Sequence, residues 1–204
     1  MKLYNSVGPN PRVVRMFMHE KGIEIPTQEI DLRGGENRRE PYISEVNPNG
    51  QCPALQLDDG SVLTEITVIC EYLDEINRDG SLIGETPEER AVTRMWTRRI
   101  DLNIVEPMAA GFRYAEGIKM FQDRIHCIPQ AADDFKAIAQ EKLIWLNGLM
   151  DGNEFVAGNK LTLADVFLFC FLDFDMAVGQ KLNPDLAWLN GWFERMKARP
   201  SAAA

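Results

Sequence analysis

The chain has 204 residues, of which 45% are hydrophobic and 26% are charged, and its formal net charge is −9. This length suffices for one ordinary hydrophobic core or for two small cores packed together. The negative charge argues against nonspecific binding to nucleic acid. The most apolar stretch, residues 166–172, is short and lies between Asp165 and Asp173. It therefore predicts a buried helix rather than a membrane span.

The first strand and helix are indicated by a short apolar run and a capping signal. Residues 2–5 predict a strand, and Asn10 predicts the N-cap of a helix whose first position is Pro11. Gly22 is the expected end of this helix. Residues 27–32 alternate between two faces, which predicts a second strand.

The next elements follow at strand and helix periods. Residues 37–46 predict a polar, irregular helix, and residues 53–57 predict an apolar strand. A hairpin turn is indicated at residues 58–60, and a short returning strand follows at residues 62–63. Residues 65–76 carry apolar side chains on one helical face. The resulting order βαβαββα is typical of a thioredoxin-type α/β unit.

Pro53 opens the apolar strand directly after a turn, where a cis peptide bond is a known feature of proteins. A cis Cys52–Pro53 bond would turn the N–H and C=O of Cys52 away from the sheet, toward an extended peptide ligand. The alternative is a trans proline at the start of an edge strand, which is commoner for an isolated X-Pro pair. The strand, hairpin and helix that follow Pro53 favour the cis form.

After residues 79–85, which predict a linker, the pattern changes to long helical periods without a strand. Thr86 and Glu89 predict a capping box, and Pro107 ends or kinks the helix that follows. Further helices are predicted at residues 135–149, 162–176 and 184–196.

Cysteine and histidine usage limits the chemistry of the protein. The four cysteines, at positions 52, 70, 127 and 170, include no C-x-x-C pair, and the two histidines, at positions 19 and 126, complete no metal site. We expect no metal and no dithiol redox chemistry of the protein's own, so a reactive thiol would come from a ligand. No charged and apolar leader opens the chain, and we expect a cytoplasmic protein that does not bind membranes.

Four segments of the sequence carry a resemblance to a known family. They are the strand at residues 2–5 with Arg12 and Val13 after it, NPNGQCPAL from Asn47, LTEITVICEYL from Leu63, and NKLTLADVFL from Asn159. Together they make nearly the whole chain similar to a cytosolic glutathione transferase of the bacterial type. The resemblance implies an α/β plus all-α fold, with a thioredoxin-like domain at residues 1–78 and a helical-bundle domain at residues 86–204.

The last of these segments contains a second capping box. Thr162 is placed to reach the backbone N–H of Asp165, and Asp165 to return to that of Thr162, with Leu161 and Val166 positioned for a hydrophobic staple. Alone, a capping box marks only the start of a helix. Behind a thioredoxin-like half it resembles a structural signature of the family that serves folding rather than catalysis.

The resemblance implies a glutathione-binding site. Its residues here are Asn37, Gln51, Cys52, Pro53, Glu65 and Ile66. Cys52 would pair its backbone N–H and C=O with the cysteinyl unit of glutathione. Glu65 would accept a hydrogen bond from the γ-glutamyl ammonium, and the N–H groups that follow it suit the γ-glutamyl carboxylate. Asn37 and Gln51 would bind the glycyl carboxylate or nearby amides, or are simply solvated. Ile66 replaces the serine that is usual in the family, which removes a hydroxyl donor.

The thiol-activating residue is less clearly indicated. Members of the family use a hydroxyl or thiol near the first helix, and Gly8 occupies the usual serine position here. Ser6 and Asn10 are therefore the catalytic candidates. The amide of Asn10 could donate to a thiolate whose pKa is also lowered by the helix N-terminus, or Asn10 could act as a cap alone. The Pro-Asn pair resembles Nu-class bacterial transferases, which are associated with disulfide reduction.

The implied function is conjugation of the glutathione thiolate, as co-substrate, to small hydrophobic electrophiles, as in detoxification. Met108, Phe112 and Tyr114 are candidate substrate contacts, whose alternative role is core or dimer packing. The resemblance also implies a homodimer. Two further functions stay open: a non-catalytic protein that binds glutathione or another ligand, and a glutathione-dependent disulfide reductase or isomerase.

Overall fold

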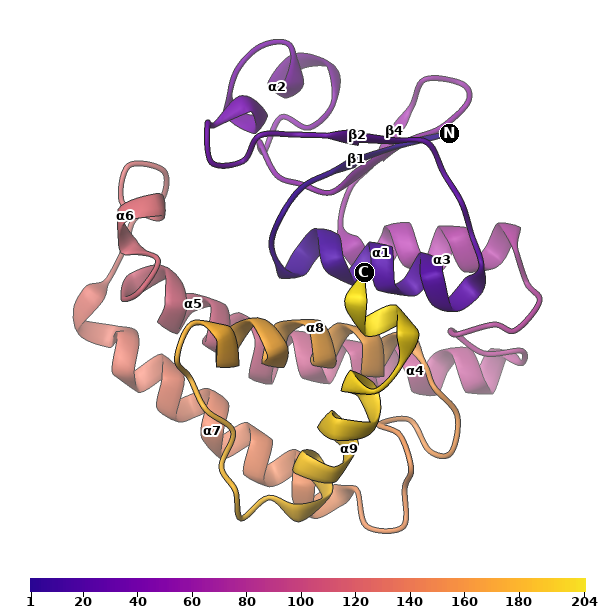
Figure 1. Cartoon of the computed structure of the whole chain (residues 1–204), viewed down its shortest axis with the longest axis vertical. Coiled ribbons are helices and arrows are strands. Elements are labelled where there is room, and N and C mark those ends of the chain that lie inside the picture. The colour runs from indigo at the N-terminus through magenta and orange to yellow at the C-terminus, as the bar shows by residue number, and fades with distance from the viewer. The chain divides into compact units, whose positions relative to one another are not determined.

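The computed structural model describes residues 1–204, which form two compact units. Unit 1 contains Met1–Glu85 together with Arg199–Ala204, and unit 2 contains Thr86–Ala198. Unit 1 is a four-stranded mixed sheet with helices, and unit 2 is helical (Figure 1). The predicted fold class, a thioredoxin-like α/β domain followed by an all-helical domain, is confirmed.

Unit 1 has the predicted order of strands and helices. Its elements are β1 (Lys2–Asn5), α1 (Pro9–Lys21), β2 (Thr27–Glu29), the 3-10 turn η1 (Glu36–Arg38), α2 (Tyr42–Glu45), β3 (Ala54–Gln56), β4 (Val62–Leu63), α3 (Ile66–Ile76) and the 3-10 turn η4 (Pro200–Ala203). The strand order in the sheet is β2-β1-β3-β4. β1 and β2 are parallel, and the other neighbours are antiparallel. α1 and α3 lie on the same face of this sheet (Figure 1).

The core of unit 1 is formed where α1 and α3 pack together. Val13, Val14 and Phe17 of α1 and Ile69 and Leu73 of α3 are completely buried. Burial of each such side chain contributes roughly 1.5–3 kcal/mol relative to exposure in water. These contacts pack a layer formed by both helices against the sheet. The loops at the sheet ends therefore have a rigid support.

The helix α1 begins earlier than the sequence predicts. Its N-cap is Gly8, with φ 107° and ψ 171°, its first residue is Pro9, and Asn10 lies inside the first turn. Glycine adopts this backbone conformation without a Cβ clash, and proline fits the first helical position because its missing N–H has no helical partner there. The prediction that Asn10 caps a helix starting at Pro11 is therefore wrong.

Two further elements differ from the predicted ones. β2 ends at Glu29 rather than at residue 32, because the chain turns immediately afterwards, with the N–H of Leu32 bonded to the carbonyl of Ile30 at 2.9 Å. The predicted irregular helix at residues 37–46 is divided into the two short pieces η1 and α2, with a cis peptide bond before Pro41.

Residues 79–85, predicted as a linker, belong to unit 1. Lys21 and Asp74 form a buried ion pair with an N···O distance of 3.1 Å. Asp74 also accepts hydrogen bonds from the Ser81 hydroxyl at 2.6 Å and the Leu82 N–H at 2.9 Å. The segment is thus fastened to α1 and α3 by charge-assisted hydrogen bonds.

The last six residues, predicted to belong to the helical domain, also group with unit 1. Arg199 donates two hydrogen bonds to the Glu20 carboxylate of α1, at 2.7 and 2.8 Å. Arg12 of the same helix donates to the Ala202 carbonyl at 2.7 Å. These contacts, 190 and 179 residues apart in the chain, have no local pattern that a sequence reading could use.

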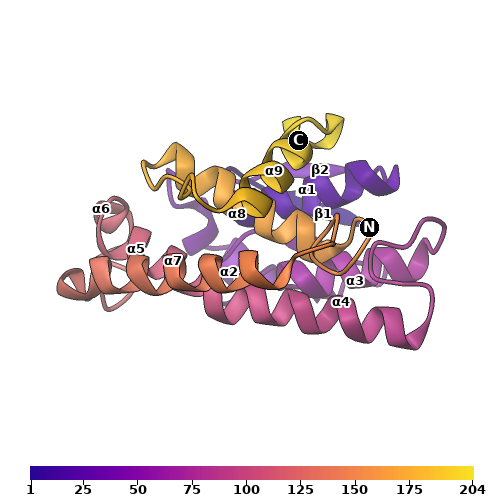
Figure 2. The same ribbon diagram turned by 90° about the horizontal axis from the view of Figure 1, so that it is seen from below.

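Unit 2 contains six α-helices and no strand. Its elements are α4 (Pro87–Ile100), the π-helical turn η2 (Asp101–Val105), α5 (Glu106–Tyr114), α6 (Ile118–Phe121), the 3-10 turn η3 (Pro129–Ala131), α7 (Ala132–Leu149), α8 (Leu163–Ala177) and α9 (Ala187–Lys197). The predicted capping box of Thr86 and Glu89 is confirmed. Pro107 lies in the first turn of α5, directly after η2. α5 and α7 lie side by side (Figures 1 and 2). No helix has the length and apolarity needed to cross a lipid bilayer.

The start of α8 is held by one buried carboxylate. Asp165 is completely buried and accepts four hydrogen bonds, from the N–H and hydroxyl of Thr162, the N–H of Val156 and the indole N–H of Trp192, at 2.8 to 3.0 Å. Burial raises the pKa of Asp165, and these hydrogen bonds oppose the rise. The carboxylate thus joins the helix start to the preceding loop and to α9.

Candidate functional site

The strand registers bring the predicted glutathione-binding residues to one end of the sheet. β1 and β3 are antiparallel, with Tyr4 opposite Ala54. Continuing this register by two residues brings Cys52 opposite Ser6, just beyond the strand ends. The loop before β3 and the loop before α1 therefore meet at this end.

The register of β3 with β4 extends the same site. Leu55 lies opposite Leu63, so the register continues to Pro53 opposite Glu65. Glu65 immediately precedes α3, which places the first turn of α3 beside the Cys52–Pro53 bond. The sequence prediction that these residues act together thus has a geometric basis in the sheet.

Glu65 is the N-cap of α3 and has an unusual backbone. Its φ of 68° makes it the only non-glycine residue of the chain in the left-handed region, a conformation that costs on the order of 1–3 kcal/mol. Its side chain is exposed and forms no capping hydrogen bond, and the first turn of α3 contains no acidic residue. The N–H groups of Ile66, Thr67 and Val68 have no partner within the protein. This helix end can therefore receive an anion.

The backbone and the side chain of Cys52 lie in different environments. The Cys52–Pro53 peptide bond is cis, and no hydrogen bond within the protein uses the N–H or the C=O of Cys52. The side chain is buried, with its Sγ 3.1 Å from the hydroxyl of Tyr42. Burial raises the pKa of the Cys52 thiol, against the smaller effect of the Tyr42 hydrogen bond. The thiol is thus unsuited to nucleophilic chemistry, whereas the main-chain groups can take a ligand.

Asn37 and Gln51 hold the loop that precedes β3. Asn37 is buried, with 1% exposure, and its amide donates to the carbonyl of Gly50. The carbonyl of Gln51 accepts hydrogen bonds from the Tyr42 hydroxyl at 2.7 Å and the Asn47 amide at 3.0 Å. The exposed side chain of Gln51 can reach a ligand, but the Asn37 amide group is already engaged. The expectation that Asn37 binds the glycyl carboxylate does not fit this burial.

Sequence reasoning did not identify Tyr42 and Asn47 as site residues. Tyr42 is buried against Tyr4. The side-chain oxygen of Asn47 accepts a hydrogen bond from the N–H of Asn49 at 3.0 Å, as in an Asx turn. The Asn-Pro-Asn-Gly run marks a turn in the sequence, and it could have indicated Asn47. No sequence signal indicated Tyr42.

The two catalytic candidates lie in different environments. Ser6 is 3% exposed, and its hydroxyl donates to the carbonyl of Ile30 at 2.6 Å, so its proton is already engaged. Asn10 is exposed in the first turn of α1. Because Pro9 and Pro11 have no N–H, the backbone and side-chain amides of Asn10 are the main hydrogen-bond donors at this turn. The geometry favours Asn10 over Ser6.

The three candidate substrate contacts all lie in unit 2. Met108 is 2% exposed and belongs to the core, which favours its alternative role in packing. Phe112 packs edge-to-face on Phe174 with a centroid distance of 4.9 Å, and Tyr114 packs on Phe135 at 5.8 Å. Phe112 and Tyr114 are only half-buried and keep surface that a ligand could contact.

Asp175 follows Phe174 near the end of α8 and is nearly buried, with 4% exposure. Burial raises the pKa of its carboxyl to about 7, with a further contribution from the negative charge of Glu116 and an opposing one from Lys136. No hydrogen bond within the protein satisfies this carboxyl. Asp175 is therefore a titrating group close to neutral pH.

The substitution Asp175→Asn is expected to remove a pH dependence of stability. Between about pH 4 and pH 7 the unfolded chain ionises Asp175 while the folded protein keeps it protonated, so the stability of the wild type falls as pH rises. Asparagine stays neutral in both states. Relative to pH 4, the variant should gain about 2–4 kcal/mol over the wild type at pH 8. Urea unfolding at both pH values measures this, and parallel pH profiles for the two proteins would contradict it.

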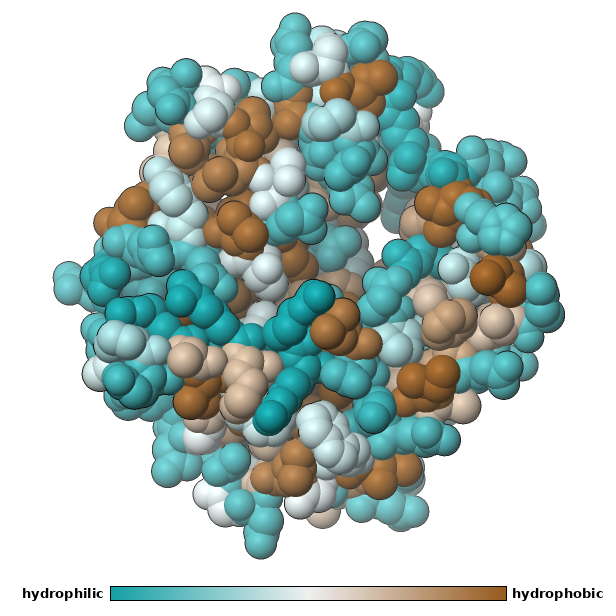
Figure 3. Space-filling view, turned by 180° about the vertical axis from the view of Figure 1, so that it is seen from behind, coloured by the Kyte–Doolittle hydropathy of each residue, from teal (hydrophilic) through white to brown (hydrophobic).

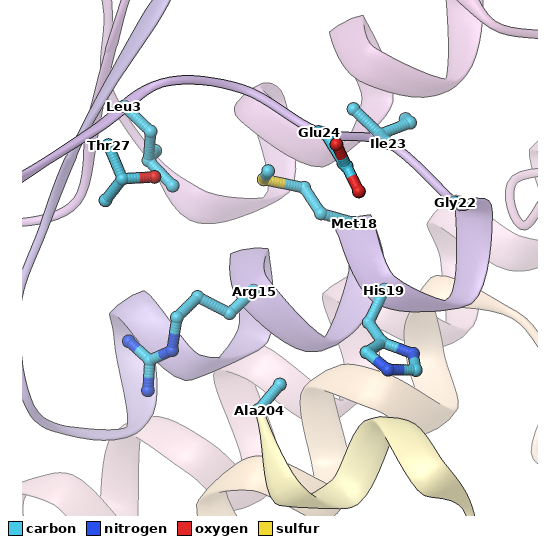
Figure 4. Close-up of a pocket in the computed structure, with 9 residues that line it drawn as sticks. All are labelled: Leu3, Arg15, Met18, His19, Gly22, Ile23, Glu24, Thr27 and Ala204. Atoms are coloured by element: carbon cyan, nitrogen blue, oxygen red, sulfur yellow. The ribbon is translucent and has the colours of Figure 1, made fainter.

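Unit 1 also contains a pocket of about 370 Å³ (Figure 4). It lies between α1 and the loop that leads to β2, with Leu3, Met18 and Arg15 among its walls and Ala204 below them. None of its lining residues is a predicted glutathione-binding or catalytic residue. No group of three or more His, Cys, Asp or Glu side chains is placed to hold a metal ion.

Both units are similar to domains of known proteins. Residues 7–76 match the family model "Glutathione S-transferase, N-terminal domain", and residues 130–200 match "Glutathione S-transferase, C-terminal domain". Glutathione S-transferase of Pseudomonas putida is 32% identical over 184 residues, covering 89% of this chain and 78% of that protein. Glutathione S-transferase 2 of Saccharomyces cerevisiae is 28% identical, covering 98% and 87%.

Solved structures show the same similarity. A glutathione S-transferase domain-containing protein of Marinobacter aquaeolei superimposes with a TM-score of 0.91 at 33% identity, covering 98% of this chain and 99% of that one. The match extends over both units, from the sheet with its loop residues to the helices of unit 2. The chain therefore belongs to the glutathione S-transferase family of enzymes.

Proposed function

We propose that this protein binds glutathione in an extended form at the end of its sheet and ionises the glutathione thiol beside α1. The resulting thiolate is then joined to a small hydrophobic electrophile. The observation that carries this proposal is the uncapped start of α3. An exposed carboxylate at Glu65, a strained backbone at the same residue, and three unpaired N–H groups after it form a site for an amino acid headgroup. The N–H groups suit the γ-glutamyl carboxylate, and Glu65 suits the ammonium.

The backbone of Cys52 supports the same orientation of the ligand. Its N–H and C=O are both unpaired, so an extended cysteinyl unit can add to the sheet end as a further strand would. Pro53 immediately precedes β3, and the exposed side chain of Gln51 is available to the glycyl end. A tripeptide bound in this way projects its thiol toward the loop before α1.

The thiol-activating group in this proposal is Asn10. A thiolate at the start of α1 gains a hydrogen bond from the Asn10 amide and the favourable field of the helix N-terminus. The thiol proton passes to solvent, and the thiolate then forms a C–S bond to the electrophile, either as a leaving group departs with its electron pair or as an activated double bond takes up a proton from solvent. Phe112 and Tyr114 are the proposed contacts of the electrophile.

Calorimetry with glutathione, followed by ultraviolet difference absorption of the bound thiolate, tests the proposal. We expect binding together with a thiolate signal at neutral pH. Asn10→Ala should weaken that signal, because it removes the amide donor, and it should do so more than Ser6→Ala, which loosens one anchor of the loop but removes no donor to the thiolate. Absence of glutathione binding, or a thiolate signal that Asn10→Ala leaves intact, would contradict the corresponding part of the proposal.

A non-catalytic binding protein is the second candidate function. Two observations favour it: Ile66 offers no hydroxyl to the ligand, and the hydroxyl of Ser6 is already bonded to Ile30. Affinity for glutathione without any thiolate signal would support this alternative. Disulfide reduction or isomerisation uses the same bound thiolate on other substrates, and assays with a glutathione mixed disulfide separate it from conjugation.

We also propose that the protein is a homodimer, as the family resemblance implies. Apolar side chains are exposed among hydrophilic ones on the molecular surface (Figure 3), and in unit 2 several lie on α4 and α7. Met95 of α4 and Ile138, Trp145 and Leu149 of α7 are each at least 38% exposed. Trp145 lies 6.3 Å, between ring centroids, from Trp96 of α4, which joins the two helix faces. Exposed apolar surface of this kind typically marks a protein interface.

The substitution Met95→Glu is expected to dissociate this dimer. A carboxylate placed in a desolvated apolar interface costs several kcal/mol, so light scattering should give the monomer mass at micromolar concentration. Met120→Glu is the matched control, because Met120 is similarly exposed on α6. A wild type that is monomeric, or a dimer that survives Met95→Glu, would rule out this interface.

A further inference from the structure

A hydrogen-bond network in unit 1 ties the loop before α1 to the helix itself. One nitrogen of the Arg15 guanidinium donates to the side-chain oxygen of Asn5 at 2.8 Å and to the backbone carbonyl of Ser6 at 2.9 Å. The Asn5 amide in turn donates to Glu29 of β2 at 2.6 Å. The network therefore joins α1, the end of β1 and β2.

The loop that this network holds leads directly to Asn10. Ser6 is fixed at two points, since its hydroxyl bonds to Ile30 and its carbonyl to Arg15. The next anchor is the Gly8 carbonyl, which accepts the N–H of Arg12 at 3.3 Å, and the intervening Val7 is exposed. A displacement of Ser6 would therefore be passed along four residues to the first turn of α1.

The direction of the Arg15 side chain fits this role. Figure 4 shows the side chain extending from the middle of α1 toward the N-terminal end of that helix, with its guanidinium turned away from Gly22 at the other end. Arg15 thus donates two hydrogen bonds to the segment that precedes α1 and also places a positive charge beside it. A nearby positive charge lowers the pKa of a thiol, in addition to any effect on geometry.

We propose that Arg15 is a positioning residue for thiol activation, which holds the Ser6–Asn10 loop against α1 and so sets the amides that receive the glutathione thiolate. This inference rests on the proposed function. It makes Arg15 important although the residue itself is one to two helical turns away from Asn10 and need not touch the ligand.

The test is a pH titration of the thiolate absorbance of bound glutathione in the wild type, Arg15→Met and Arg15→Lys. Arg15→Met removes both hydrogen bonds and the charge, and it should raise the ionisation midpoint by about one pH unit. Arg15→Lys keeps the charge but not the planar donor geometry, so it should give a smaller rise. Glutathione affinity at low pH should change less than about threefold, because Cys52 and the start of α3 are untouched.

Hydrogen exchange supplies a readout that does not depend on glutathione. In Arg15→Met the amide protons of Arg12 and Ile30, which donate to the carbonyls of Gly8 and Asn5, should exchange about tenfold faster, while those of α3 keep their protection. If Arg15→Met fails to fold, the midpoint and the exchange rates in Arg15→Lys decide the question. An unchanged midpoint in a folded variant would overturn the proposal.

Arg199→Met is the matched control. Arg199 pairs with Glu20 at the other end of α1, so this variant should lower thermal stability without moving the thiolate midpoint. An equal shift in Arg199→Met would show that general loosening of α1 is responsible, and would overturn the role of Arg15. If the wild type binds glutathione without a thiolate signal, the proposed function and this inference fall together. If the wild type gives the signal and Arg15→Met titrates identically, only the inference falls.

Discussion

Replacement of Asp165 by alanine is expected to destabilise the protein by about 3–5 kcal/mol, the largest effect among the substitutions considered. Four donors converge on this buried carboxylate, two of them from Thr162 and one each from Val156 and Trp192. Alanine leaves these donors buried without a partner and also opens a cavity at the start of α8. Much of this cost arises from the unsatisfied donors rather than from the lost bonds themselves.

Guanidinium unfolding of Asp165→Ala measures this effect, with Asp123→Ala as the control at an exposed aspartate. The control should change the free energy of unfolding by less than about 0.5 kcal/mol. The loss in the free energy of unfolding for Asp165→Asn should lie between those of Asp165→Ala and Asp123→Ala. The single side-chain oxygen of asparagine can accept hydrogen bonds from only some of the four donors. A loss below about 1 kcal/mol in Asp165→Ala would refute a structural role for this carboxylate.

Substitution of Glu65 by glycine is expected to weaken glutathione binding by roughly 30- to 100-fold without lowering thermal stability. The loss in affinity follows from removal of a charge-assisted hydrogen bond to the γ-glutamyl ammonium, worth about 2–3 kcal/mol. Stability should not fall, because glycine adopts the φ of 68° observed at this position without strain. Binding and stability therefore respond differently to the same change.

Calorimetry and thermal unfolding of the same sample measure the two quantities. Glu65→Gln is the matched control, since it keeps a hydrogen-bond acceptor of the same length, and it should lose less affinity than Glu65→Gly. Glutathione binding that is equal in Glu65→Gly and the wild type would remove the start of α3 from the proposed site. A large fall in melting temperature would show instead that Glu65 holds the helix.

The elements that were predicted well are those with local signals. The order βαβαββα follows from apolar periods, glycines and prolines within a few residues of one another, and the structure confirms it. The capping box at Thr86 depends on a spacing of three residues and is present. The carboxylate of Asp165 reaches the N–H of Thr162 as expected. Its contacts with Val156 and Trp192 lie 9 and 27 residues away and could not be read from the motif.

The candidate site shows the same division. Cys52 was identified from the proline that follows it, a local feature, and Glu65 from the resemblance to the family; the sheet register explains why the two lie together. Asn37 was assigned to the ligand, but it is buried and bonded to Gly50, because the loop before β3 folds over it. Polar residues in loops carry no periodic pattern, so their burial depends on contacts that form only in the folded chain.

The sequence by itself determined the two fold classes and the cap at Thr86, because these depend on backbone preferences over short distances, whereas the candidate residues of the sheet end came from the resemblance to the family. Only the tertiary structure decided that Asn10 lies inside the first turn of α1, that Met108 is core, and that the last six residues complete unit 1. The placement of the last six residues rests on long-range pairs such as Arg199 with Glu20. Such pairs are selected by packing of the whole chain, which leaves no trace in neighbouring residues.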